Sequence, residues 1–125
     1  MTVRAAILAV TLSLALAAGC GGSGGGGGSQ PAGSVKVTMT EFKFDPSTIS
    51  VKPGNATFYL VNSGSVAHDM IVLSSDGKRV AGSELVQGGN TSLFTVNGLT
   101  AGSYRIICDQ PGHEAAGMKG TLTVA

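Results

Sequence analysis

Short runs of alternating apolar and polar residues fill the chain from about residue 34 to its end. The first run, residues 35–40, reads Val, Lys, Val, Thr, Met, Thr, and Phe42 and Phe44 then continue in the opposite phase. Alternation with a period of two is typical of a strand with one buried face. The change of phase predicts a β-bulge near Thr40-Glu41.

Further strand-like runs follow, each ended by turn residues such as Pro, Gly, Asn and Asp. Phe58 and Leu60 share one face of their run, and the run that begins at His68 is almost wholly apolar, as in a strand covered on both faces. Residues 74–89 are irregular, with at most one helical turn at 80–86. The runs lie at 35–44, 49–51, 56–62, 68–73, 91–96, 103–108 and 121–124. We count seven or eight strands and no amphipathic helix, which predicts an all-β fold, an antiparallel β-sandwich.

The first 19 residues have the pattern of a signal peptide. A short start containing Arg4 precedes residues 5–18, which are apolar apart from Thr11 and Ser13. This stretch is shorter than the ~20 apolar residues of a membrane span, but it suits the core of a signal peptide. A buried helix is the alternative, but Gly-rich sequence follows at once and offers no packing partner. We therefore expect export to an extracytoplasmic compartment, the periplasm or the cell surface.

The signal-like segment ends at Cys20, and the small residues before it resemble a bacterial lipobox, in which the cysteine is lipidated. Leu16 stands four places before Cys20, where the usual spacing is three, so ordinary cleavage and a soluble product is the alternative. Residues 21–33 are nearly all Gly and Ser, which predicts a flexible tether with a mean reach of about 20 Å. The expected organisation is a signal peptide (1–19), a lipidated Cys20 with its linker (20–33) and one domain (34–125).

Charge and cysteine content limit the possible functions of the protein. Once Arg4 is removed, seven basic and seven acidic side chains remain, and no basic cluster is present, which argues against nucleic-acid binding. The chain has two cysteines. If Cys20 is lipidated, Cys108 is an unpaired thiol in an oxidising compartment, and is either inert, nucleophilic or a metal ligand. A Cys20–Cys108 disulfide is a further alternative, but it is disfavoured because it would join a flexible linker to the domain.

A thiol, an imidazole and a thioether fall within one expected loop, at Cys108, His113 and Met118. The loop leaves one strand at Cys108 and returns to another near Gly120, so these donors can converge at one end of the sandwich. The only other histidine, His68, also stands at the end of an expected strand. Thiolate and thioether select copper, and two His, one Cys and a weak axial Met are the donors of a blue-copper electron-transfer site.

Each of these residues has a simpler explanation when it is taken alone. A single Cys or Met is most often core filler, and alternation places Met39 and Met70 in the core with no functional role. Tyr104 is interpreted as a structural corner tyrosine. The copper site is favoured because one metal geometry accounts at once for both histidines, the domain's cysteine and one methionine.

These motifs resemble the cupredoxins, the blue-copper proteins typified by plastocyanin, azurin, auracyanin and rusticyanin. Residues 41–46 and 51–54 look like the family's opening hairpin, 66–70 like its first-histidine segment and 102–120 like its ligand loop. The Cys-x4-His-x4-Met spacing is most similar to the auracyanin and rusticyanin type. The resemblance implies a Greek-key sandwich that holds one copper ion, cycling between Cu(I) and Cu(II), through His68, Cys108, His113 and Met118.

The resemblance also assigns roles around the ligands. Ala67 and Asp69 would flank His68 just outside the metal's ligands. Several family members have Asn after the first His, and its side chain pins the ligand loop; an ionised Asp69 cannot donate and must accept a hydrogen bond instead. His68 would be the interior ligand, and the electron would leave through His113. The surrounding rim would be small and uncharged: Pro111, Gly112, Ala115, Ala116 and Gly117.

Four protein ligands leave no open position for a substrate, so we expect an electron carrier and not an enzyme. A multicopper oxidase or nitrite reductase would need further histidines, and the chain has only two. An extracytoplasmic copper-binding or delivery module is the alternative, although such a protein should have an open or Met-rich site. A purely structural exported domain is a third. The expected partners are redox proteins and, through Cys20, a membrane; we expect a monomer.

Overall fold

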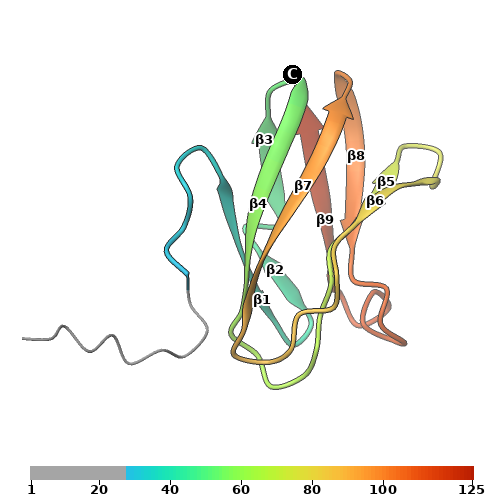
Figure 1. The fold of residues 1–125 in the computed structure, drawn as a ribbon. Helices are drawn as coiled ribbons and strands as arrows, with labels where there is room; N and C mark the ends of the chain where they lie inside the picture. The colour runs from blue at the N-terminus through green and yellow to red at the C-terminus, as the bar shows by residue number, and fades with distance from the viewer. Residues whose placement is uncertain (1–27) are drawn as a thin grey trace, which may run out of the picture.

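Two β-sheets face each other in the computed structural model, which describes residues 28–125 (Figure 1). One sheet has the strand order β2-β1-β4-β7 and the other β3-β9-β8-β5-β6. The described range contains nine strands: β1 (Val35–Thr40), β2 (Lys43–Asp45), β3 (Thr48–Val51), β4 (Gly54–Asn62), β5 (Ile71–Ser74), β6 (Arg79–Gly82), β7 (Thr91–Leu99), β8 (Gly102–Ile107) and β9 (Lys119–Val124). The predicted signal peptide, Cys20 and most of the predicted linker lie outside these residues.

No helix within residues 28–125 is long and apolar enough to cross a membrane. The described residues form two sheets of strands and contain no helix, which confirms the all-β sandwich predicted from the alternation for this range, but the count of seven or eight strands is too low. Two strands were not foreseen: β2, which the sequence pattern merged with β1 in one run, and β6, in the stretch predicted to be irregular. β6 is the edge strand of its sheet and its residues are exposed or half-buried, so it has little need of apolar alternation.

The sandwich predicted to be antiparallel consists of two mixed sheets. Among the described strands, β1 pairs with β4 and β3 pairs with β9 in parallel, while the other pairings are antiparallel. The cause is the turn at residues 46–47, where the chain leaves the first sheet after β2 and enters the second as β3. As a result β3 pairs with neither β2 nor β4, its neighbours in sequence, and alternation alone does not reveal this.

The predicted β-bulge near Thr40-Glu41 is wrong. Thr40 pairs with Lys43 across an antiparallel ladder, so Glu41 and Phe42 form the turn of a two-residue hairpin. The phase changes because the chain reverses, and Met39 and Phe44 both remain buried as cross-strand partners. The hairpin leaves Glu41 and Phe42 exposed at one end of the sheet, near the predicted copper ligands.

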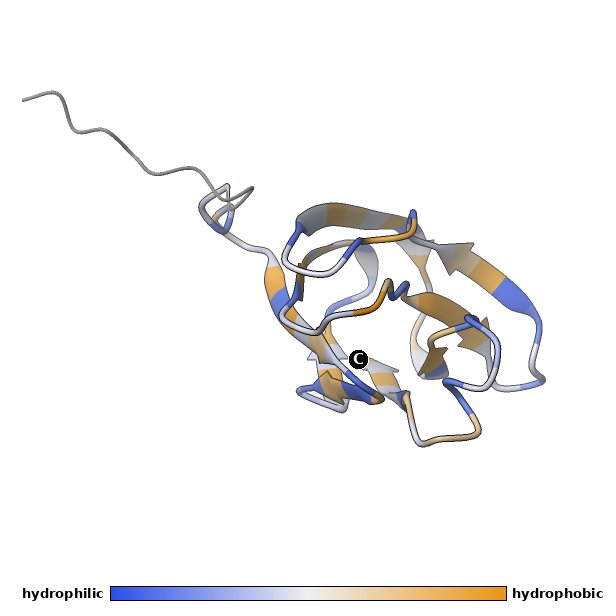
Figure 2. Cartoon of the chain, turned by 90° about the horizontal axis from the view of Figure 1, so that it is seen from below, coloured by the Kyte–Doolittle hydropathy of each residue, from blue (hydrophilic) through white to orange (hydrophobic). Residues whose placement is uncertain are grey.

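The core between the sheets is formed by the apolar positions of the alternating strands, which Figure 2 shows as bands of opposite hydropathy. Phe58 and Leu60 are fully buried, as predicted, and so are Met39 and Met70. Each such side chain contributes about 1.5–3 kcal/mol through its burial. The loops that carry the predicted ligands lie at the end of the sandwich opposite the C-terminus (Figure 1).

Candidate metal centre

His68 is fully buried and lies just before β5. Its backbone forms an isolated antiparallel bridge with Val86: His68 N donates to Val86 O over 3.0 Å, and Val86 N donates to His68 O over 2.8 Å. The buried Asn62 supports this bridge, since its amide nitrogen donates to the carbonyls of Val66 and Val86 at 2.8 Å each. The same side chain accepts from Gly64 N at 2.9 Å. The backbone at His68 is therefore held in place by Val86 and by the hydrogen bonds of Asn62.

Cys108 follows β8 directly and is fully buried. The segment from Cys108 to Met118 folds back on itself, because Cys108 N donates to Met118 O at 3.1 Å and Met118 N donates to His113 O at 3.0 Å. The backbone turns at Gly112 and Gly117, whose φ angles of 79° and 114° favour glycine. This closed loop places His113 opposite His68.

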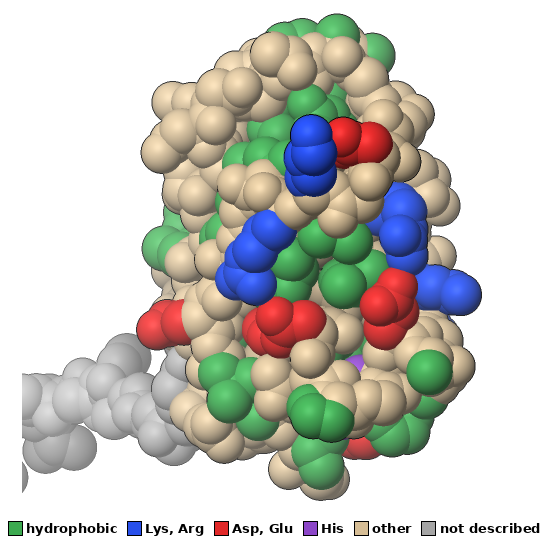
Figure 3. Space-filling view, turned by 90° about the vertical axis from the view of Figure 1, so that its right-hand side faces the viewer, with side chains coloured by type: hydrophobic (Ala, Val, Ile, Leu, Met, Phe, Trp, Pro, Cys, Tyr) green, Lys and Arg blue, Asp and Glu red, His purple; other side chains and the backbone are tan. Residues whose placement is uncertain are grey.

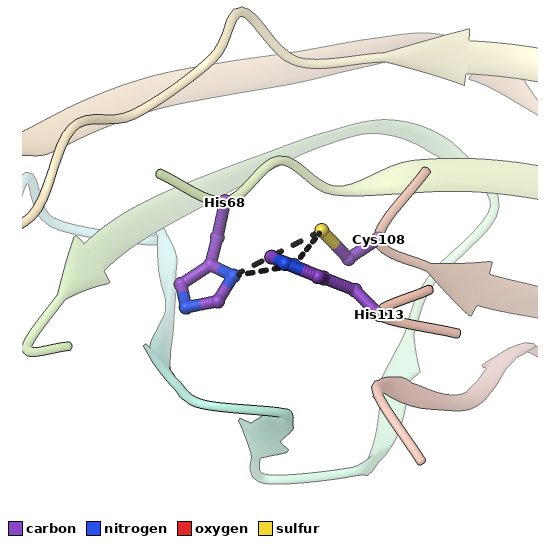
Figure 4. Close-up of side chains that lie close together, drawn as sticks. All are labelled: His68, Cys108 and His113. Atoms are coloured by element: carbon purple, nitrogen blue, oxygen red, sulfur yellow. Dashed lines mark hydrogen bonds between the residues drawn. The ribbon is translucent and has the colours of Figure 1, made fainter. Parts of the chain in front are cut away.

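Three of the predicted ligands come together (Figure 4). His68 Nδ1 lies 3.2 Å from His113 Nδ1, and Cys108 Sγ lies 3.5 Å from His113 Nδ1 and 4.0 Å from His68 Nδ1. Metal–nitrogen bonds of about 2.0–2.1 Å and metal–sulfur bonds of about 2.3 Å, as in protein zinc sites, would place trigonal ligand atoms about 3.5–3.8 Å apart. The observed separations fit one ion held by two imidazoles and a thiolate.

Met118 belongs to the same loop and its side chain is fully buried in the core cluster together with Cys108. The two hydrogen bonds of its backbone, to Cys108 and His113, tie it to both residues. The backbone of the methionine is thus joined to two of the three converging donors, and its side chain offers a thioether, a soft ligand of the kind that copper accepts.

Comparisons with known proteins agree with this arrangement. The family model described as "Copper binding proteins, plastocyanin/azurin family" matches residues 31–125. The chain belongs to this copper-binding family. The cupredoxin fold expected from the sequence is confirmed, and the site is that of a protein that holds one copper ion.

A relative in Rubrivivax gelatinosus, described as "Copper-resistant cuproprotein CopI", is 27% identical over an alignment 108 residues long, and the match covers 73% of this chain. The match spans 66% of the relative's length, just under two thirds. Auracyanin A of Chloroflexus aurantiacus, a "blue" copper protein, is 25% identical with a TM-score of 0.61, and the match covers 72% of this chain and 99% of auracyanin A. Reduced auracyanin of Roseiflexus castenholzii, at 19% identity, has a TM-score of 0.67 and covers 77% of this chain and 99% of its own. The last similarity concerns the fold alone.

Burial sets the protonation of the cupredoxin donors. It raises the pKa of the Cys108 thiol, which remains protonated at neutral pH unless a cation is bound. Burial also lowers the pKa of His68, and the neighbouring His113 lowers it further. His68 is therefore a neutral imidazole, the form that can bind a metal. A copper ion would stabilise the thiolate of Cys108, as metals do for coordinating thiols.

Asp69 pins the ligand loop in the way its acidic side chain predicts. Its Oδ1 accepts from Asp109 N at 2.9 Å, and its Oδ2 accepts from Gln110 Nε2 at 3.3 Å. Burial raises the pKa of Asp69, while the hydrogen bond with Asp69 and the nearby Arg79 lower the pKa of Asp109. Ala67, the other residue expected next to the ligands, is half-buried, and its methyl group cannot form a hydrogen bond.

Sequence reasoning missed two residues that support His68, namely Asn62 and Glu41. Glu41 Oε1 accepts from Ser65 N at 2.7 Å and Val66 N at 3.0 Å, and it lies 3.5 Å from Nε2 of His68. The N–H groups of Val66 and Ser65 lower the pKa of Glu41, so it is ionised at neutral pH. An acidic residue in a tight hairpin turn was the available signal for Glu41. Asn62 ends an apolar strand, and its burial depends on the tertiary structure.

Phe42 was also missed. Its ring contacts His113 edge-on, with centroids 4.9 Å apart and an interplanar angle of 69°. The rest of the expected rim is exposed at Pro111, Gly112, Ala115, Ala116 and Gly117, whereas His113 itself is half-buried. Figure 3 shows apolar side chains gathered at this end of the molecule and charged side chains in a band above them. Phe42 thus adds an aromatic side chain to a rim of small residues.

Proposed function

We propose that this protein is a mononuclear blue (type 1) copper protein that carries single electrons between redox partners, with His68, Cys108, His113 and Met118 as the ligands. The observation that carries the proposal is the approach of two imidazole nitrogens and one thiol sulfur to within 4.0 Å of one another, with a buried methionine beside them. Copper bound there would accept and release one electron. A protein-derived ligand at every position would leave no place for a substrate, which favours a carrier over an enzyme.

The two histidines would have different roles, one as an anchor for the metal and the other in electron transfer. His68 is fully buried, so it would act as an interior anchor. His113 is half-buried on a loop with several exposed, uncharged residues, so its ring edge would give the electron a short route from the site to solvent. Phe42 would hold that ring in place through the edge-on contact. The electron would enter and leave here, through a small and transient docking face.

We propose an extracytoplasmic location on the basis of the first 33 residues. The signal-like segment, the lipobox-like end at Cys20 and the Gly/Ser stretch would together place the domain on a tether at a membrane surface. Redox proteins within the reach of that tether would be its donors and acceptors. The protein would act as a monomer, and its balanced charge provides no strong field to steer a charged partner.

The central experiment is a titration of the purified mature protein with Cu(II), followed by visible absorption. We expect an intense band from the thiolate–copper bond at one equivalent of copper, followed by reversible one-electron reduction. Cys108→Ser should abolish the band. Cys20→Ser, which removes the other cysteine, is the matched control and should retain it. A colourless wild-type protein would overturn the proposal.

Copper handling is the second candidate, and one observation favours it: the relative described as a copper-resistant cuproprotein. A protein that stores or delivers copper should lose Cu(I) rapidly to a chelator, whereas an electron carrier should retain it through many redox cycles. The rate of copper transfer to a chelator, measured beside the rate of electron self-exchange, distinguishes the two functions.

A further inference from the structure

His68 has two ring nitrogens with different surroundings. Nδ1 faces Cys108 and His113, whereas Nε2 is fully buried on the opposite side of the ring and makes no hydrogen bond among the described residues. An anionic group lies near Nε2: Oε1 of Glu41 is 3.5 Å away from it. A histidine that binds a metal through Nδ1 carries its proton on Nε2. This N–H would then lie next to a carboxylate from the hairpin turn.

The position of the Glu41 carboxylate is defined by the neighbouring loop. Oε1 accepts two backbone hydrogen bonds, from Ser65 and Val66, just ahead of His68 in the chain. Gly64 makes room for it, since a Cβ at that position would overlap Oε1. The side chain of Glu41 is 37% exposed, so solvent reaches it only in part and its charge acts on a fully buried ring.

We propose that Glu41 is a positioning residue of the copper site: its carboxylate holds the Nε2–H tautomer of His68, keeps Nδ1 directed at the metal and stabilises Cu(II) relative to Cu(I). The inference deepens the proposed function and rests on it. A carboxylate behind a metal-bound histidine fixes the ring and increases its basicity as a ligand. A negative charge near the metal also favours the more positive oxidation state. Glu41 lies 27 residues before His68 in the chain, and only the hairpin brings the two together.

A purely structural role is the competing explanation, because Glu41 also accepts from the loop at Ser65 and Val66. Glu41→Gln separates the two roles. The amide oxygen of Gln can still accept both backbone hydrogen bonds, so the loop is retained while the charge is lost. A purely structural role of Glu41 predicts an unchanged reduction potential in Glu41→Gln, whereas the proposed role predicts a higher reduction potential.

The test is spectroelectrochemistry of the copper-loaded full chain. For Glu41→Gln we expect the thiolate–copper band to remain and the Cu(I)/Cu(II) ratio at a fixed solution potential to rise about tenfold, which corresponds to about 59 mV for one electron. The matched control is Asp76→Asn, which removes the same charge from the turn after β5, at the end of that strand away from His68. We expect it to shift the ratio less than twofold. A shift below twofold in Glu41→Gln, with the wild type blue and redox-active, would overturn the inference alone; a colourless wild type would overturn the proposed function.

Gly64→Ala gives an independent variant that keeps the negative charge. Its backbone conformation is open to alanine, but the new Cβ would displace the end of the Glu41 side chain. In the diamagnetic Cu(I) protein, NMR should detect a slowly exchanging His68 Nε2–H in the wild type. We expect this signal to exchange faster in both Gly64→Ala and Glu41→Gln. Retention of the wild-type exchange rate in both variants would contradict the proposed contact.

Discussion

The two histidines of the site have the same side chain but differ in burial and in the elements that hold them. His68 is fully buried, its backbone is paired with Val86, and Asn62 and Glu41 hold the segment around it. His113 is half-buried on a loop, with one aromatic neighbour in Phe42 and otherwise small exposed residues. One side of the site is thus built from the sandwich and the other from a loop at its end.

This difference shows how one ion can be both protected and accessible. The buried side holds the donors in place, which limits rearrangement when the charge of the metal changes. In the proposed function, the loop side would keep the path to solvent short and leave space for a partner. Because the two sides are built from different elements, substitutions should affect them separately.

The largest contrast is expected from removing each ring in turn. His68→Gly and His113→Gly should both lose the thiolate–copper band, but added imidazole should restore it only in His113→Gly, because only that gap opens to solvent. Visible spectra with and without imidazole test this. Restoration in His68→Gly, or its failure in His113→Gly, would break the comparison.

On the buried side, removal of the Asn62 side chain should lower the free energy of unfolding more than removal of an exposed asparagine. Asn62→Ala removes the donor to the Val66 and Val86 carbonyls and the acceptor of the Gly64 N–H, although Val86 O keeps its bond from His68 N. We expect a loss of about 2–3 kcal/mol in the free energy of unfolding. Asn55→Ala is the matched control, since the exposed Asn55 accepts only from Gly98 N; it should cost about 0.5 kcal/mol. Urea denaturation of both variants measures the difference, and equal losses would show that the buried amide has no special role.

Copper binding should depend on pH through the buried thiol. The pKa of Cys108 is raised by burial, so the free protein carries the protonated thiol at pH 7.5–8.5 and metal binding releases its proton. His68 has a lowered pKa, so it is already neutral and releases none. The apparent affinity for copper should therefore rise about tenfold per pH unit, or about 1.4 kcal/mol, and fall as the pH falls. Competition with a chelator of known pH dependence measures this, and a flat profile would contradict it.

On the loop side, Phe42→Ala should have a moderate effect. The edge-on contact with His113 is worth about 0.5–1.5 kcal/mol, and its loss should loosen the ring without removing a ligand. We expect the visible band to be retained and electron self-exchange to slow by several-fold. Phe94→Ala, a core substitution beside Phe58, is the contrasting variant: it should lower the stability of the fold by about 3–5 kcal/mol and leave the colour of the folded protein unchanged.

The smallest effect is expected at the ion pair between Arg105 and Glu114, whose nitrogen and oxygen are 2.7 Å apart on the surface. Both side chains are partly exposed, so Arg105→Ala should cost only about 0.2–1 kcal/mol of stability. The cost should shrink further at high salt. A thermal melt at low and high ionic strength measures it, and a loss as large as that of Asn62→Ala would show that the loop is held more firmly than its exposure indicates.

Local residue patterns predicted a large part of this structure. The alternation at Phe58 and Leu60 marks a buried face because side chains of a strand point to opposite sides in turn. The segment from Cys108 to Met118 contains three donors within eleven residues, so its glycines and short length bring them together whatever the rest of the chain does. The edge strand β6 was missed for the opposite reason, since an exposed strand needs little apolar alternation.

The sequence by itself determined the types of donor, the spacing of the ligand loop and the all-β character, because these depend on neighbours along the chain. The tertiary structure decided which strands pair in parallel and what surrounds His68. It brings Glu41 from a hairpin turn, and Val86 from beyond β6, to a histidine far away in the chain. Contacts over such separations depend on how the two sheets exchange strands, and no local pattern of residues encodes that exchange.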